Sequence, residues 1–214
     1  MKMQLLFEEN SVVLWVIESP SLMRRFIGEM KQQVNGGEGR FVLSDQTKEL
    51  DIVKNIALIT DIFEIDANEK KCWNKALAEI KDCAFNEKHY LHTKRLFAEI
   101  QEYLFSLELD SQCNICFDEI DFVQLIKASG GRIEGDEEPV NNIVCYMKSI
   151  VALLHTRMIV FVDLADFLEK SELEMVMQQA KYLNLNVLLI ESKQIYLESI
   201  QKCYIIDKDM CEIY

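Results

Sequence analysis

Proline and glycine are scarce in this chain of 214 residues, which has two prolines and seven glycines. Their scarcity excludes a collagen-like repeat, a proline-rich linker and low-complexity disorder. Long hydrophobic runs are missing as well, and none approaches the roughly 18 residues of a membrane span. The N-terminus lacks a hydrophobic core followed by a small-residue cleavage site, so we expect no secretory signal.

Basic residues are also few, because 23 Lys and Arg stand against 36 Asp and Glu, giving a net charge of −13. Taken alone, this charge disfavours a nucleic-acid binder, since phosphates are repelled by an acidic surface. The cysteines number seven, and an odd count without a signal peptide indicates reduced thiols. Half of the residues are apolar, enough for a substantial core. We therefore expect a cytoplasmic globular protein with no membrane contact.

Short apolar runs near both ends of the chain predict buried strands. They cover residues 12–17, 56–59, 158–162, 186–190 and 203–206. Helical patterns lie between them, one starting at Ser19-Pro20 and another at Ser171, where Glu174 completes a capping box. Continuous apolar strands that alternate with helices predict parallel pairing with right-handed crossovers. The two ends therefore predict one α/β domain.

The middle of the chain has a helical period instead. Apolar stripes over residues 72–80 and 96–107, with a break at Asn86, predict a helical hairpin. Further helices are expected over residues 120–127 and after Pro139. We interpret this region as an insertion into the α/β domain. The expected boundaries are 1–62 and 143–214 for the α/β domain and 63–142 for the insertion.

An α/β domain raises the possibility of nucleotide binding. The glycine-rich segment Gly36–Gly39 follows a helix and precedes a strand, the reverse of a phosphate-binding loop, and no Gly-Lys-Ser/Thr is present. Asp163 follows an apolar strand, as does the Mg²⁺-binding Asp of P-loop enzymes, but without the loop we interpret it as a capping or solvated residue. A nucleotide-binding or hydrolysing enzyme is the alternative function.

Two patterns suggest metal ligands. The pair His89-x-x-His92 and the pair Cys113-x-x-Cys116 offer zinc-type donors, but the cysteines lie in a strand-like segment that would place them on opposite faces. Acidic residues flank the short helix expected at 120–127. Such oxygen donors suit Ca²⁺, which takes about six to eight of them, while a solvated pair of acidic loops is the simpler interpretation. The acids are Asp118, Glu119 and Asp121 before the helix, and Glu134, Asp136, Glu137 and Glu138 after it.

Six segments along the chain form an ordered set: Gly36–Ser44, Phe117–Asp121, Met158–Leu164, Leu168–Glu174, Val187–Glu191 and Tyr204–Ile213. In order and spacing the set resembles the small CRISPR-associated adaptation protein of type II-A systems. The resemblance implies a homotetrameric ring whose chains combine an α/β head, similar to a P-loop ATPase core without the phosphate loop, with an inserted α-helical leg. It further implies a protein without catalytic activity that binds linear double-stranded DNA by its ends, through the central hole, when calcium is bound by acids of the leg. The implied partners are the CRISPR integrase proteins and the type II-A effector nuclease, in spacer acquisition.

The resemblance also implies roles for residues, by position for the calcium ligands and without a motif for the bases that face DNA. The implied calcium ligands are Asp118, Glu119 and Asp121 first, and Glu134, Asp136 and Glu137 second. The bases expected to face DNA are Arg24, Arg25, Lys127, Lys148 and Arg157, although a solvated helix face is the usual explanation for bases so thinly spread. The net charge permits this function, because DNA affinity depends on local phosphate neutralisation, and a symmetric ring multiplies each base in its hole.

Overall fold

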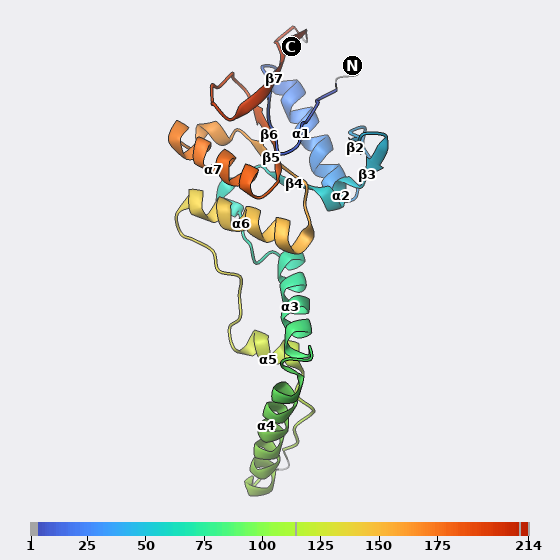
Figure 1. Cartoon of the computed structure of the whole chain (residues 1–214), viewed down its shortest axis with the longest axis vertical. Coiled ribbons are helices and arrows are strands. Elements are labelled where there is room, and N and C mark those ends of the chain that lie inside the picture. The colour runs from blue at the N-terminus through green and yellow to red at the C-terminus, as the bar shows by residue number, and fades with distance from the viewer. Residues whose placement is uncertain (1–3, 114, 210, 214) are drawn as a thin grey trace. The chain divides into compact units, whose positions relative to one another are not determined.

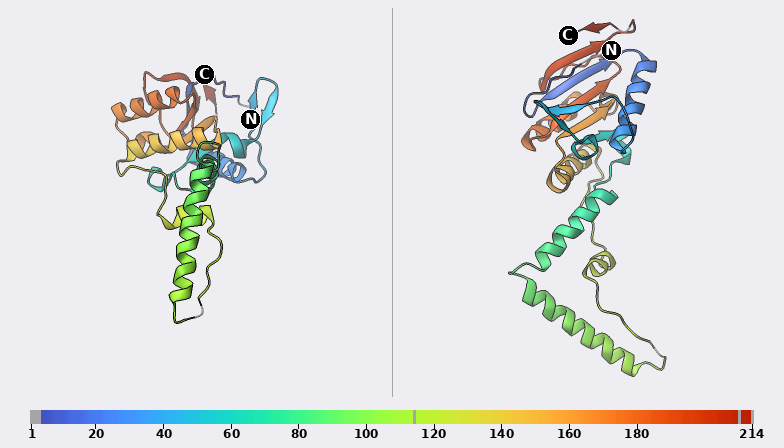
Figure 2. Two further views of the ribbon diagram at one scale, coloured as in Figure 1. Left: turned by 60° about the horizontal axis from the view of Figure 1, so that its bottom comes forward. Right: turned by 90° about the vertical axis from the view of Figure 1, so that its right-hand side faces the viewer.

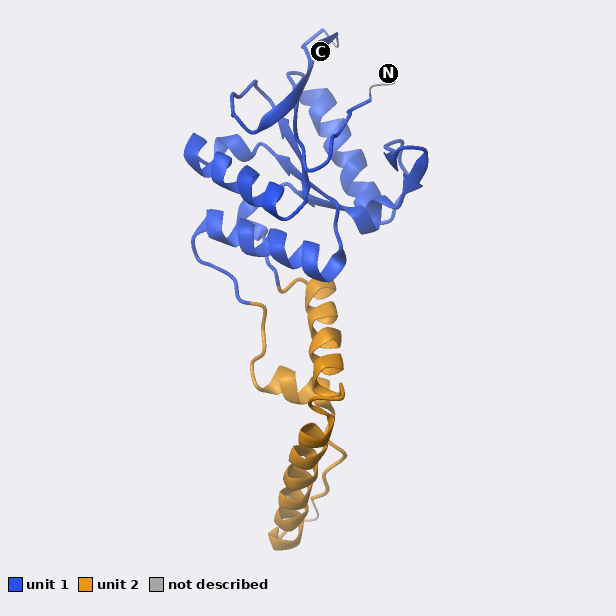
Figure 3. Cartoon of the chain, in the orientation of Figure 1, with its two compact units in different colours: residues 1–67, 134–214 blue, residues 68–133 orange. Residues whose placement is uncertain are grey.

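A computed structural model describes residues 4–113, 115–209 and 211–213 of the chain (Figure 1). Asn114 and Met210, which fall within the motifs quoted above, lie outside the described residues. The chain divides into two compact units, residues 1–67 with 134–214, called the head, and residues 68–133, called the leg (Figure 3). The leg lies within the expected insertion but is shorter at both ends, because residues 63–67 and 134–142 belong to the head, the latter with the rest of helix α6 (Pro139–Leu154).

The head contains a sheet of apolar strands that run almost entirely in parallel. Over the described residues the strand order is β4-β5-β6-β1-β7-β8, and only the pairing of β7 with β8 is antiparallel. Buried apolar strands of this kind confirm the predicted parallel α/β fold. The strands are β1 (Val12–Ile17), β4 (Ile56–Ile59), β5 (Met158–Val162), β6 (Asn186–Glu191), β7 (Ile200–Ile206) and β8 (Glu212–Ile213).

Helices cover both faces of this sheet. Helix α1 (Pro20–Val34) packs on the face that carries Val13, Trp15 and Ile17, where Trp15 stacks on Phe26 with ring centroids 5.1 Å apart. Because alternate strand residues point to opposite faces, Val12, Leu14 and Val16 point to the other side. Helices α6 and α7 (Lys170–Tyr182) lie there (Figure 2, right).

A small hairpin follows α1 in the head. Strands β2 (Leu43–Asp45) and β3 (Lys48–Leu50) pair antiparallel, and the short helix α2 (Ile52–Asn55) leads into β4. The buried side chain of Gln33 ties the entry to the hairpin to α1, since its amide donates to the Phe41 carbonyl (2.9 Å) and its oxygen accepts from the Phe41 N–H (3.0 Å).

The leg contains three helices over its described residues, α3 (Lys70–Ala84), α4 (Tyr90–Asp110) and α5 (Phe122–Ala128). The predicted helical hairpin is wrong, because α3 and α4 diverge from their short connection instead of packing side by side (Figure 2, right). Contacts form around that connection instead, where the rings of Phe85, Phe97 and Phe122 lie 5.5–6.4 Å apart. The apolar stripe of α4 therefore lacks the helix that the sequence suggested as its partner.

Three further expectations can be compared with the structure. Helix α7 begins at Lys170 rather than Ser171, because Glu169 and Glu172 form the capping box, with the Glu169 N–H donating to the Glu172 carboxylate (2.7 Å). All seven cysteines lie among the described residues, and no disulfide joins any of them. Within the part of the chain that is described, no helix combines the length and the hydrophobicity that crossing a membrane requires.

Candidate functional site

Arg24 and Arg25 lie near the start of α1 with both side chains exposed. The Arg25 guanidinium sits 5.2 Å from the centre of the Phe26 ring, a cation–π contact that orients it along the helix surface. Helix α1 starts directly after β1, so both arginines belong to the edge of the sheet at which the parallel strands end.

The other candidate bases lie elsewhere in the chain. Arg157 precedes β5, at the opposite edge of the sheet, and its guanidinium pairs with the exposed Asp45 carboxylate at 3.1 Å. Lys148 is exposed on α6, across the sheet from α1, and Lys127 is exposed on α5 in the leg. The four candidate bases of the head therefore do not gather on a single surface.

The first three candidate calcium ligands belong to the leg. Asp118, Glu119 and Asp121 are exposed in the segment between α4 and α5. Asp121 caps α5, because its carboxylate accepts the Gln124 N–H at 2.7 Å. One of its two carboxylate oxygens thus has a structural role, and the other keeps its lone pairs for a further partner.

The second three belong to the head and precede α6. Glu134, Asp136 and Glu137 are exposed, and Asp136 accepts the Glu138 N–H at 2.9 Å. Glu138 itself caps α6 by accepting the amides of residues 140 and 141 at 3.2 Å and 2.8 Å. Among the described residues of the single chain, no three His, Cys, Asp or Glu side chains converge as a metal site. The acids have the oxygen chemistry that calcium requires, but one chain does not assemble them into a coordination shell.

The candidate zinc ligands are not brought together either. His89 precedes α4 and His92 lies in its first turn, while Cys113 and Cys116 are exposed beyond its end. The described residues around the cysteines form no strand, contrary to the strand-like segment expected there. These side chains do not converge within the described part of the chain.

A cluster that the sequence did not predict lies where β5 and β6 end. Glu191, the last residue of β6, is 1 % exposed, and its carboxylate accepts the Ala165 N–H at 3.2 Å. Asp163, just after β5, has a left-handed backbone (φ 51°) and accepts the Ser192 N–H at 3.3 Å. Asp166 pairs with Lys193 at 2.6 Å. Asp163 makes no side-chain cap bond, and its partly exposed side chain links the ends of two neighbouring strands.

Electrostatics in this cluster follow from burial and like charge. The pKa of Glu191 is raised to about 7, chiefly by burial and also by the charges of Asp163 and Asp166, against the opposing effect of the Ala165 amide. Burial also raises the pKa of Asp163. The signal in the sequence was the acid at the end of each apolar strand, but burial of the Glu191 side chain depends on the turn over residues 164–166, which residue spacing does not reveal.

The turn between β1 and α1 bears on the nucleotide alternative. Phosphate-binding domains place a glycine-rich loop there, with backbone amides that cradle the phosphate. Here the turn consists of Glu18 and Ser19, and Pro20 at the first helical position has no N–H to offer. A carboxylate and a missing amide disfavour a phosphate at this position.

Comparison with known proteins agrees with the fold. Residues 33–210 match a family model described as CRISPR-associated protein (Cas_Csn2). The chain is 27% identical over 174 residues to the CRISPR-associated protein Csn2 of Streptococcus agalactiae, covering 78% of this chain and 75% of that protein. Its fold is similar to the crystal structure of Stu0660 of Streptococcus thermophilus, with a TM-score of 0.65 and 10% identity over 97% of this chain and 72% of that one. The chain belongs to the Csn2 family of CRISPR-associated proteins, which is involved in adaptation in type II-A CRISPR systems.

Proposed function

We propose that this protein is a non-enzymatic, calcium-dependent homotetrameric ring that binds linear double-stranded DNA by its ends and so supports spacer acquisition. The observation that carries the proposal is the uncovered apolar surface of the leg. The integrase proteins and the effector nuclease of the type II-A system are the partners that we propose for it.

The surface of α4 supports self-association. The structure describes all 21 residues of this helix, and none of them is buried in the single chain. Large apolar side chains are exposed along it, with Leu91 at 80 %, Leu109 at 73 % and Tyr103 at 62 % exposure. An isolated helix with this much apolar surface is unfavourable in water, and burial against other copies stabilises it by about 25 cal/mol per Å².

The positions of the bases support an assembly rather than a monomer as the DNA-binding form. A single acidic chain with five scattered bases offers few phosphate contacts. A closed ring repeats each base in every subunit, and bases that lie at its hole from several copies act on the same duplex. The electrostatic term then comes from local neutralisation and counterion release, despite the net charge of −13.

Exposed acids support a role for calcium in assembly. The carboxylates in the leg and those before α6 belong to separate units, and in each group one oxygen already accepts a backbone amide, so each leaves fewer oxygens than the roughly six to eight of a calcium shell. Additional ligands from a neighbouring copy would complete the shell, and calcium would supply positive charge that offsets acid–acid repulsion between subunits. In this proposal Asp118, Glu119 and Asp121 hold the ion first.

The absence of catalysis is part of the proposal. The turn from Glu18 to Pro20 disfavours a nucleotide phosphate, and within the described residues the buried acid Glu191 is held by a backbone amide of the neighbouring turn rather than by a His or Ser partner. ATP turnover by the purified protein would favour the nucleotide enzyme instead.

A test of the assembly uses mass measured by light scattering, with calcium and with a chelator. The variant Ile100→Ser, Tyr103→Ser removes apolar area from one exposed face of α4, and Glu102→Ser on the same helix is the control. We expect about four chain masses for the native and control proteins in calcium, and smaller species for the double variant, since each lost side chain removes about 1 to 3 kcal/mol of burial. Tetramers of equal stability in both variants would exclude α4 as the assembly surface.

A further inference from the structure

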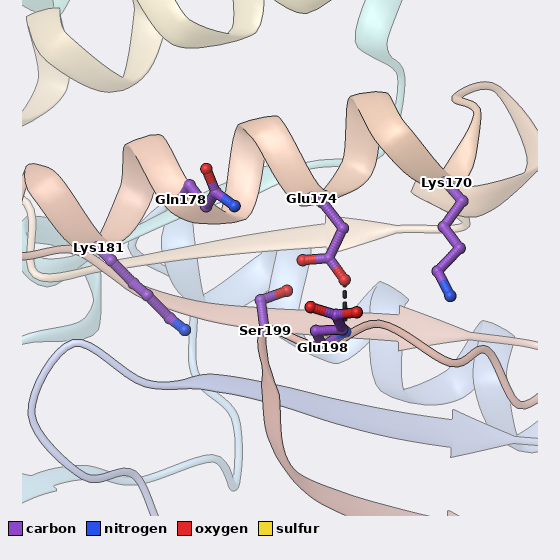
Figure 4. A pocket seen from close by; sticks show the side chains of 6 residues that line it. All are labelled: Lys170, Glu174, Gln178, Lys181, Glu198 and Ser199. Carbon is purple, nitrogen blue, oxygen red and sulfur yellow. Dashed lines mark hydrogen bonds between the residues drawn. The ribbon is translucent and has the colours of Figure 1, made fainter.

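A pocket of about 360 Å³ lies on the head, between α7 and the segment that enters β7 (Figure 4). Its lining residues are Lys170, Glu174, Gln178, Lys181, Glu198 and Ser199. Residues 170, 174, 178 and 181 are spaced by four, four and three, so they share one face of α7. The pocket belongs entirely to the head and contains none of the DNA or calcium candidates.

The connection between β6 and β7 explains why the space is open. Both strands run parallel to β1, so residues 192–199 must return along the length of the sheet. Such crossovers usually contain a helix, but the structure describes all of residues 192–199 and they contain none. The Glu198 N–H donates to the Glu174 carboxylate and fixes this extended crossover beside α7 (Figure 4).

Ser199 is the feature that points to a ligand. Ser199 is 5 % exposed, and its hydroxyl has no hydrogen-bond partner within the described part of the chain. Figure 4 shows that hydroxyl facing α7, below the side chains of Gln178 and Glu174. A buried hydroxyl without a partner costs free energy, and a ligand or ordered solvent in the pocket would recover it.

Charge in the pocket selects the class of ligand. Among the described residues, neither the Lys170 nor the Lys181 ammonium takes part in an ion pair. At one end Lys181, Gln178 and Ser199 offer an ammonium, an amide and a hydroxyl, all of which can donate to an oxyanion. At the other end Lys170 lies beside Glu174 and Glu198, so two acids against one base leave this end negative, which disfavours polyphosphates and nucleic acid (Figure 4).

We propose that this pocket binds a small molecule that carries one oxyanion group, either phosphate or carboxylate, at Lys181, Gln178 and Ser199. The two sources differ in the rest of the ligand. Inorganic phosphate uses the donor end alone. A zwitterion such as glycine uses both ends, with its carboxylate at Lys181 and its ammonium at Glu174 or Glu198.

The test is a thermal-melting titration of the full chain in calcium-free buffer with inorganic phosphate or with glycine. We expect one of them to raise the melting temperature saturably, with a dissociation constant of about 1 mM or lower. Ser199→Ala should melt at least as high as the native protein without ligand, and should bind about 5- to 10-fold more weakly. Lys181→Gln should weaken binding to a similar extent. This variant tests the same pocket if Ser199→Ala does not fold.

The matched controls are Ser44→Ala and Lys31→Gln, which change exposed residues outside the pocket. A response to phosphate alone identifies free phosphate as the source, and a response to glycine alone identifies a zwitterionic carboxylate. The proposal is overturned if neither compound gives a saturable response, or if the pocket variants respond as their controls do.

Discussion

Burial determines the behaviour of Glu191, whose side chain lies where β5 and β6 end, with Asp163 and Asp166 close enough to repel its charge. The folded protein favours the protonated form of this acid. Its pKa is about 7 in the fold against an ordinary value of 4.5. The stability that protonation supplies is therefore complete below pH 4.5, declines as the pH rises, and is lost once the pH passes about 7.

Glu191→Gln removes this pH dependence, because the amide keeps an oxygen for the Ala165 N–H and never carries a charge. We expect the variant to exceed the native protein in free energy of unfolding by about 1 to 3 kcal/mol near pH 8, and to differ little near pH 5. Urea denaturation at the two pH values measures this, with the exposed Glu49→Gln as the control. An equal difference at both pH values would show that Glu191 does not titrate in this range.

The environments of single side chains were the least predictable feature of the protein. The sequence placed Asp163 correctly after a strand, yet whether such an acid is solvated, capping or linking depends on which backbone amides lie near it. Here the left-handed turn at Asp163 and the return of the chain at Ser192 bring carboxylate and amide together, and both are tertiary features. The same holds for Ser199, whose burial depends on a crossover that lacks a helix.

At the scale of elements, two neighbouring acids before α6 have different expected roles, one in capping the helix and one in binding calcium. Glu138 caps the helix through two backbone amides, whereas Glu137 is exposed, and no cap bond to it is found among the described residues. Glu138→Ala should lower the free energy of unfolding by about 1 kcal/mol, the usual value of an N-cap, and leave calcium binding unchanged.

Glu137→Ala should do the reverse, with unchanged stability in chelator and weaker calcium binding. Chemical denaturation and calcium titration of the two variants measure both quantities. If Glu137→Ala binds calcium as the native protein does, Glu137 is not a ligand.

Elements were predictable where local chemistry alone fixes them. Apolar β-branched runs identified β1, β4, β5 and β6 because a strand buried on both faces has to be apolar throughout. The packing of α3 and α4 was not predictable, since an apolar stripe shows that a helix is to be covered but not what covers it. Among the residues that the structure describes, none buries the apolar stripe of α4, which is why we propose that other copies cover it.

At the scale of the whole molecule, the acidic charge makes any DNA contact depend on a few bases. Arg24→Gln with Arg25→Gln removes two bases from every subunit, so a ring would lose many phosphate contacts at once. We expect binding of linear duplex to weaken by about 10-fold or more, and the dependence of log affinity on log salt to become shallower, by about 0.9 for each lost contact.

The control removes equal charge outside α1, with Lys48→Gln in β3 and Lys54→Gln in α2, both at exposed residues. It should bind nearly as the native protein does, because these lysines are not among the bases proposed to face DNA. Equal losses in both variants would mean that overall charge, rather than a localised surface, governs binding. Filter binding at several salt concentrations provides affinities and slopes together.

The central claim is that a calcium-dependent ring takes DNA by its ends. An electrophoretic mobility assay tests it most directly, with one duplex sequence presented either as a linear fragment or as a covalently closed circle, each in calcium or in chelator. A covalently closed circle has no end that can enter the hole of a closed ring. We therefore predict a shifted band for only one of the four samples, the linear duplex in calcium. Equal binding of the two topologies, or binding that persists in chelator, would contradict the account.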